Sequence, residues 1–98
     1  MKNYNRIHWE TVSYAVDKPN RNEDENVDIY VFDDGLIYAE VIPAEIIHGG
    51  PKNGWTCNVR QSGHAVGYAS RYFATLNQAK ADAHKNIQRL AMALEFFK

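Results

Sequence analysis

Three side chains of types that bind zinc, His48, Cys57 and His64, occur in one stretch of the chain. Structural zinc sites take pairs of ligands two to four residues apart, and no two of these three residues have that spacing. We therefore expect no metal ion. Cys57 is better explained as a core residue and the two histidines as loop residues.

Acid–base or nucleophilic chemistry has two further candidates. His8 and Glu10 are two residues apart, which places them on one face of a strand, where they could serve acid–base chemistry if a third group oriented the histidine; we favour two solvated strand residues. Cys57 alternates in phase with Trp55 and Val59, which is typical of a packed side chain rather than a reactive thiol. We therefore predict a protein that is not an enzyme and needs no cofactor.

Two segments resemble ligand-binding loops in composition only. Residues 49–54 are rich in glycine, yet they match no phosphate-loop pattern, and a predicted strand rather than a helix follows them. Residues 24–28 are acidic, yet they lack the twelve-residue loop and closing glutamate of a calcium site. Both segments are interpreted as solvated loops.

Charge is distributed unevenly along the chain. Residues 17–45 contain nine acidic and two basic residues, a net charge of −7, whereas residues 46–98 carry +5. An acidic surface of this kind can imitate a nucleic-acid backbone and bind a basic groove on a partner. The candidate partner-binding acidic residues are Glu23, Asp24, Glu25, Asp28, Asp33 and Asp34.

The elements that must position these residues form one α+β domain spanning residues 1–98. Its length, 45% apolar residues and 23% charged residues are those of a small globular domain with one core. Strand patterns predict an antiparallel meander of about five strands, with a hairpin turn at Asp33-Asp34-Gly35 and a strand end at Pro43. The predicted strands are 7–16 with a bulge near Glu10-Thr11, 27–32, 36–42, 55–61 and 66–73.

A long amphipathic helix is predicted at the C-terminal end of the sequence. Thr75 and Gln78 form a capping-box pattern at its start. Its apolar residues follow three- and four-residue spacing, so one face must pack on the sheet. These residues are Leu76, Ala79, Ala83, Ile87, Leu90, Leu94 and Phe97.

One helix covers only one face of a sheet, and the chain has twelve aromatic residues. Some of them must lie on the other face, as a partner site, as the interface of a homodimer, or in a sheet that curls and shields itself. We take Tyr30, Phe32 and Tyr38 as candidate aromatic partner-binding residues.

Basic residues gather on the polar face of the predicted helix and on the preceding strands. Residues 55–94 resemble the C-terminal half of a double-stranded RNA-binding domain, with Ala79-Lys80 and Ala83 matching its helix and Asn77-Gln78 in place of its paired lysines. The resemblance implies an alternative function in nucleic-acid binding. The residues that would carry it are Arg60, Arg71, Lys80, His84, Lys85 and Arg89.

The sequence contains no apolar run long enough for a membrane span or a secretion signal, and Cys57 is its single cysteine. These features predict a cytoplasmic protein that does not bind membranes. We predict a protein-binding module acting through its acidic and aromatic surface. Small proteins without catalytic motifs are common among phage-encoded inhibitors of host defence, such as anti-CRISPR and anti-restriction proteins, so that class supplies an analogy.

Overall fold

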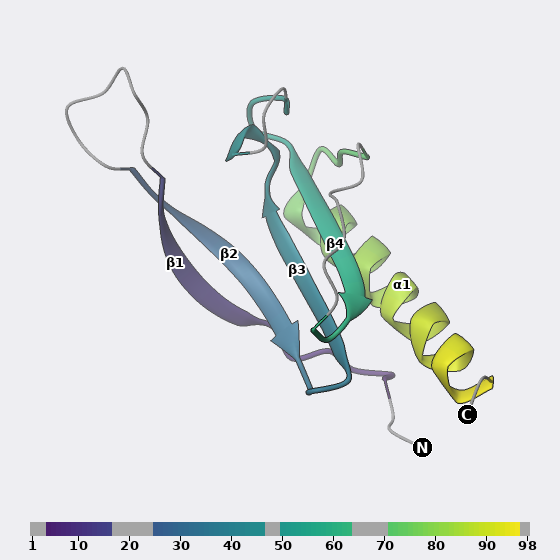
Figure 1. Cartoon of the computed structure of the whole chain (residues 1–98). Coiled ribbons are helices and arrows are strands. Elements are labelled where there is room, and N and C mark those ends of the chain that lie inside the picture. Colours follow the sequence, from purple (N-terminus) through teal and green to yellow (C-terminus); the bar gives the residue numbers. More distant parts are fainter. Residues whose placement is uncertain (1–3, 17–24, 47–49, 64–70, 97–98) are drawn as a thin grey trace.

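The computed structural model describes residues 4–16, 25–46, 50–63 and 71–96. The described elements form an antiparallel meander of four strands in the order β1-β2-β3-β4, with one helix packed against β3 and β4 (Figure 1). The predicted α+β class is confirmed. The elements are β1 (Glu10–Val16), β2 (Glu25–Asp33), β3 (Ile37–Pro43), the short 3-10 helix η1 (Ala44–Ile46), β4 (Trp55–Gln61) and α1 (Leu76–Phe96).

The sheet has four described strands where about five were predicted. Most of the predicted strand 66–73 lies outside the described residues. At its end, the Phe73 and Trp55 backbones form an isolated antiparallel bridge, with N–H to carbonyl distances of 2.7 and 2.8 Å. The described residues therefore show only a bridged pair beside the start of β4.

The predicted turn between β2 and β3 is confirmed. Gly35 has φ +87°, which only glycine adopts without strain. Asp34 Oδ1 accepts hydrogen bonds from the backbone N–H groups of Leu36 and Ile37, at 2.9 and 2.8 Å. β3 ends at Pro43, as the missing backbone donor of proline requires.

The predicted bulge near Glu10-Thr11 is wrong. β1 pairs with β2 one residue to one over its whole length, from Glu10 opposite Val31 to Val16 opposite Glu25. The apolar pattern changes phase because Trp9 precedes the strand and packs into the core from a separate N-terminal segment. The phase change therefore marks the start of β1 rather than an irregularity inside it.

The helix begins with the predicted capping box. The Gln78 N–H donates to Thr75 Oγ1, and the Thr75 N–H donates to Gln78 Oε1, both at 3.2 Å. Ala79, Ala83 and Ile87 are fully buried against the sheet. The small alanines let α1 approach β4 closely, and they share a core cluster with Val41 and Cys57.

The molecule is elongated, with extents of 50 × 23 × 22 Å. β2 pairs with β3 only from Tyr30 to Asp33, whereas β2 pairs with β1 along its full length. Residues 12–16 and 25–29 therefore form a two-stranded arm that pairs with no other described strand and extends from the body (Figure 1). Among the described residues, no helix combines the length and apolar character needed to cross a membrane.

Candidate functional site

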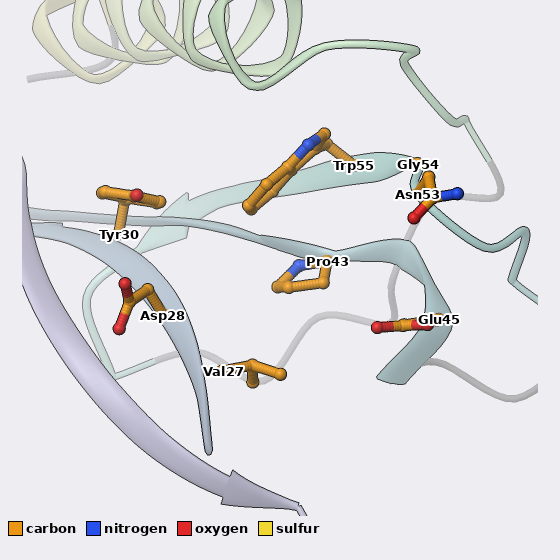
Figure 2. Close-up of a pocket in the computed structure, with 8 residues that line it drawn as sticks. All are labelled: Val27, Asp28, Tyr30, Pro43, Glu45, Asn53, Gly54 and Trp55. Carbon is orange, nitrogen blue, oxygen red and sulfur yellow. The ribbon is translucent and has the colours of Figure 1, made fainter. Parts of the chain in front are cut away.

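A cleft of about 460 Å³ opens where β2 and β3 diverge beyond Tyr30. Figure 2 shows its residues, which come from β2, the end of β3, η1, the turn before β4 and the first residue of β4. It lies at the root of the β1–β2 arm. The lining residues are Val27, Asp28, Tyr30, Pro43, Glu45, Asn53, Gly54 and Trp55.

Two aromatic rings form one wall of the cleft. The Tyr30 and Trp55 ring centroids are 6.2 Å apart with an interplanar angle of 55°. The Trp55 backbone is held by its two hydrogen bonds to Phe73, so its ring is positioned by the sheet. The Lys80 Nζ lies 4.2 Å from the Tyr30 ring centroid, which shows that this ring already accepts a cation from within the chain.

Two exposed carboxylates belong to the opposite wall and the rim. Asp28 comes from the part of β2 that pairs with β1 but not with β3, and Glu45 comes from η1. The turn beside them is tightly packed, because a Cβ on Gly54 would lie 3.1 Å from Pro51 Cγ and 3.5 Å from Ala44 Cβ. The cleft thus combines fixed aromatic surfaces with solvated negative charge.

A backbone edge also borders the cleft. Residues 25–29 of β2 pair with β1 on one side, and β3 pairs with β2 only from Tyr30 onward. In the described part of the chain, this edge has no strand beside it. Such an edge is a template on which an extended segment can add a strand.

Three of the six predicted acidic residues, Asp28, Asp33 and Asp34, have described side chains, and these three are spread along β2 and the turn that follows it. Asp28 lies in the cleft, whereas Asp33 lies about 16 Å further along β2. Asp33 Oδ1 accepts the Gly35 N–H at 2.9 Å, and Asp34 Oδ2 accepts the Tyr4 hydroxyl at 2.6 Å. Of the other three, Glu23 and Asp24 lie outside the described residues, and Glu25 is the first residue of β2.

The predicted aromatic residues lie on both faces of the sheet. Tyr30 faces the cleft, and Phe32 packs in the core edge-on to Tyr4 and Trp9, at 6.3 and 6.5 Å. Tyr38 lies on the face away from α1, where its hydroxyl donates to Glu40 at 3.0 Å. Only Tyr30 of the three therefore belongs to the cleft.

Most of the predicted basic residues contact other groups of the chain. Arg60 lies 4.3 Å above the Tyr38 ring, and Arg71 lies 3.6 Å from Asp82. His84 Nε2 is 2.6 Å from the Tyr4 carbonyl oxygen. The Lys80 ammonium group lies over the Tyr30 ring. Lys85 and Arg89 are exposed on α1.

Cys57 is buried beneath α1, where its thiol donates to Asp82 Oδ2 at 3.5 Å. Burial raises the pKa of this thiol to about 12, and the Asp82 charge and hydrogen bond add to the shift. The thiolate needed for nucleophilic attack is therefore disfavoured.

His48 and His64 lie outside the described residues, and His8 and Glu10 are exposed. The described side chains include no group of three or more histidine, cysteine or acidic residues able to hold a metal ion.

Among the residues of the cleft, Asp28 and Tyr30 are predicted partner-binding residues, whereas Glu45 and Trp55 are not. Trp55 was assigned to the buried face of its strand, and it does pack partly against the core. The residues meet because β2 and β3 separate after four paired positions, and no local pattern signals that separation.

No protein-family model, curated protein or solved structure matches this chain. The fold and the cleft define its class by themselves. It is an α+β protein in which a four-stranded meander, covered by one helix, carries an aromatic and acidic cleft at the root of a β-hairpin arm.

Proposed function

We propose that the protein is a non-enzymatic binding module that captures a basic, extended segment of a partner protein in this cleft. The observation that carries the proposal is the combination of the Tyr30 and Trp55 rings with the Asp28 and Glu45 carboxylates beside an unpaired strand edge. Each feature recognises a different part of such a segment.

The side chain that fits best is arginine. Its planar guanidinium stacks on aromatic rings and donates paired hydrogen bonds to carboxylates. The edge of β2 at residues 25–29 supplies backbone donors and acceptors for the main chain of the same segment. Main-chain pairing then provides affinity, and the cleft provides selection for a cationic side chain.

The intramolecular Lys80–Tyr30 contact supports this assignment. An ammonium group 4.2 Å from the ring centroid has the geometry of a cation–π interaction. A cation from a partner would approach the same aromatic wall, so Lys80 is expected to oppose it by like-charge repulsion. Removing the Lys80 charge should therefore strengthen partner binding.

For the partner, we propose a nucleic-acid-processing complex with a basic groove, inhibited in the manner of anti-CRISPR or anti-restriction proteins. Support comes from the net charge of −7 over residues 17–45, which includes both carboxylates of the cleft. A groove that binds phosphates presents the arginine and lysine side chains that this surface recognises.

The test of the proposed function uses capture of bacterial proteins on the immobilised full-length chain after nuclease treatment. The variant Asp28→Asn should lose most of the captured partner, with Asp33→Asn as the matched control. Both residues are exposed aspartates of β2, but only Asp28 lines the cleft. Equal loss in both variants, or in neither, would contradict the cleft as the binding site.

The nucleic-acid alternative rests on Lys80, Lys85 and Arg89 of α1, of which Lys85 and Arg89 are exposed. The variant Lys80→Gln separates the two functions because they predict opposite signs. Nucleic-acid binding should weaken when Lys80 is neutralised, whereas capture of a basic segment should strengthen. A salt-sensitive affinity for duplex RNA that falls in Lys80→Gln would support the alternative.

A further inference from the structure

Among the described residues, the first strand of the sheet, β1, pairs with β2 on one edge and has no strand beside its other edge. Its outer edge is the margin of the sheet farthest from α1 (Figure 1), and its side chains from Glu10 to Ala15 are all exposed. Val12 and Tyr14 are 42% and 52% exposed and lie on the face away from the helix. These are two of five large exposed apolar side chains among the described residues.

Edge strands of monomeric proteins usually carry lysine, proline or a bulge that prevents pairing with another strand. β1 contains no lysine and no proline, and its register with β2 is regular throughout. The six residues from Thr11 to Val16 carry no charge at all. This edge is therefore open to a further strand.

In the described part of the chain, the arm also has no third strand paired with it. At residues 12–16 and 25–29, β1 and β2 form a ribbon of two strands, and such a ribbon is marginal in water without a third strand or a packed face. An additional strand on the β1 edge would supply this missing stabilisation.

The sequence of β1 indicates that the additional strand is β1 of a second copy, because the residues of β1 are complementary to those of an antiparallel copy of the same strand. In an antiparallel pair centred on Ser13, Val12 faces Tyr14 of the second copy, and Thr11 faces Ala15. A β-branched side chain opposite an aromatic one, as in the pair of Val12 with Tyr14, stabilises neighbouring strands. Glu10 faces Val16, so the single charge of the strand meets no like charge.

We propose that the protein is a homodimer in which β1 pairs antiparallel with β1 of a second copy, about a two-fold axis through Ser13. The two sheets then form one continuous sheet of eight strands, and the interface is of the isologous kind that two-fold dimers require. The clefts lie away from this edge, on the β3 side of β2 in each copy. The proposal therefore stands independently of what the clefts bind.

The first measurement is the mass of the full-length chain in solution by light scattering after gel filtration. We expect twice the chain mass of 11.2 kDa. A single species of one chain mass up to the highest soluble concentration would overturn the proposal.

The register is tested by oxidative cross-linking of Ser13→Cys. Two-fold pairing brings the two introduced thiols opposite each other, within reach of a disulfide. Cys57 is 8% exposed, so the introduced thiol is the accessible one. Thr11→Cys is the matched control, because its two copies would be about 13 Å apart in this register. Efficient cross-linking at Ser13 alone supports the register, whereas equal cross-linking of both variants or of neither overturns it.

A charge rescue tests the same pairing without cysteine. Val12→Glu and Tyr14→Lys should each shift the chain toward monomer, because each places an unpaired charge opposite an apolar side chain. The double variant places the introduced carboxylate of one copy opposite the introduced ammonium group of the other and should restore the dimer. Restored mass with an unchanged helical circular dichroism signal supports the pairing. A double variant that remains a folded monomer overturns it.

Discussion

At the scale of single residues, the contact between Cys57 and Asp82 leads us to a prediction about the pKa and the alkylation rate of the Cys57 thiol. Burial comes first among the causes that raise the pKa of Cys57, and the Asp82 charge and hydrogen bond follow. Asp82→Asn removes the charge while keeping a polar side chain of the same shape. We expect the pKa of Cys57 to fall and its rate of alkylation to rise in this variant.

The measurement is the pH dependence of iodoacetamide labelling in the native variant and the native parent. Asn86→Ala is a useful control, because Asn86 donates to Asp82 at 3.1 Å without contributing a charge near the thiol. Identical labelling profiles for the parent and Asp82→Asn would show that burial alone protects Cys57.

The raised pKa of Cys57 also leads to a prediction of how the free energy of unfolding depends on pH. The pKa of Cys57 is about 12 in the native chain against 9.0 for an ordinary thiol, so above pH 9 the unfolded chain loses the proton first. Its contribution to stability is complete below pH 9 and is lost as the pH rises toward 12. Tyr4 acts in the same direction, because burial and Asp34 raise its pKa from 10.0 to about 12.

Denaturant unfolding across this alkaline range measures the effect. Cys57→Ala should reduce the fall in the free energy of unfolding that begins near pH 9. Tyr4→Phe should reduce the part of that fall that begins near pH 10. If the free energy of unfolding falls with the same slope in both variants and in the parent, other titrating groups cause the loss of stability.

At the scale of the elements, the most deeply packed residue of α1 is Ile87. It is fully buried in a cluster with Ile37 and Ala39, whereas Leu90 beside it is only half-buried. Ile87→Ala should lower the free energy of unfolding by about 3–4 kcal/mol through the cavity it leaves, and Leu90→Ala by about half as much. Chemical denaturation of both variants checks the order, and a larger loss at Leu90 would contradict the described packing.

The capping box gives a second prediction for α1. Thr75→Ala leaves the Gln78 N–H without its acceptor and should cost about 1 kcal/mol. Thr75→Ser keeps the hydroxyl group and should restore most of the loss. Equal unfolding midpoints for the alanine and serine variants would show that the cap contributes little.

These elements were largely predictable from the sequence because their signals are local. The helix is indicated by Thr75, Gln78 and apolar spacing, and the β2–β3 hairpin by Gly35 in its turn. The sequence predicts no cleft, because Glu45 and Trp55 join Asp28 and Tyr30 only through the divergence of two strands. Divergence follows from how the arm and the body pack, and a single sequence carries no periodic signal for it.

At the scale of the whole molecule, stability should fall along the sheet from the helix-covered body to the arm. Val41 and Ala39 of β3 are fully buried beneath α1, whereas β1 is exposed from Glu10 to Ala15. Hydrogen exchange should therefore be slowest in β3 and β4 and fastest in residues 12–16 for the isolated monomer. Uniform protection across the four strands of a monomeric variant would contradict this gradient.

The position of α1 also has a consequence for biosynthesis. The residues of α1 that cover the core, from Leu76 to Leu94, leave the ribosome after the strands they cover. At about 5–20 residues per second, the interval between Pro43 and Leu76 is roughly 2–7 s. During that interval Ile37, Ala39 and Val41 have no helix above them, so the nascent chain presents a transient binding site for chaperones that the finished protein conceals.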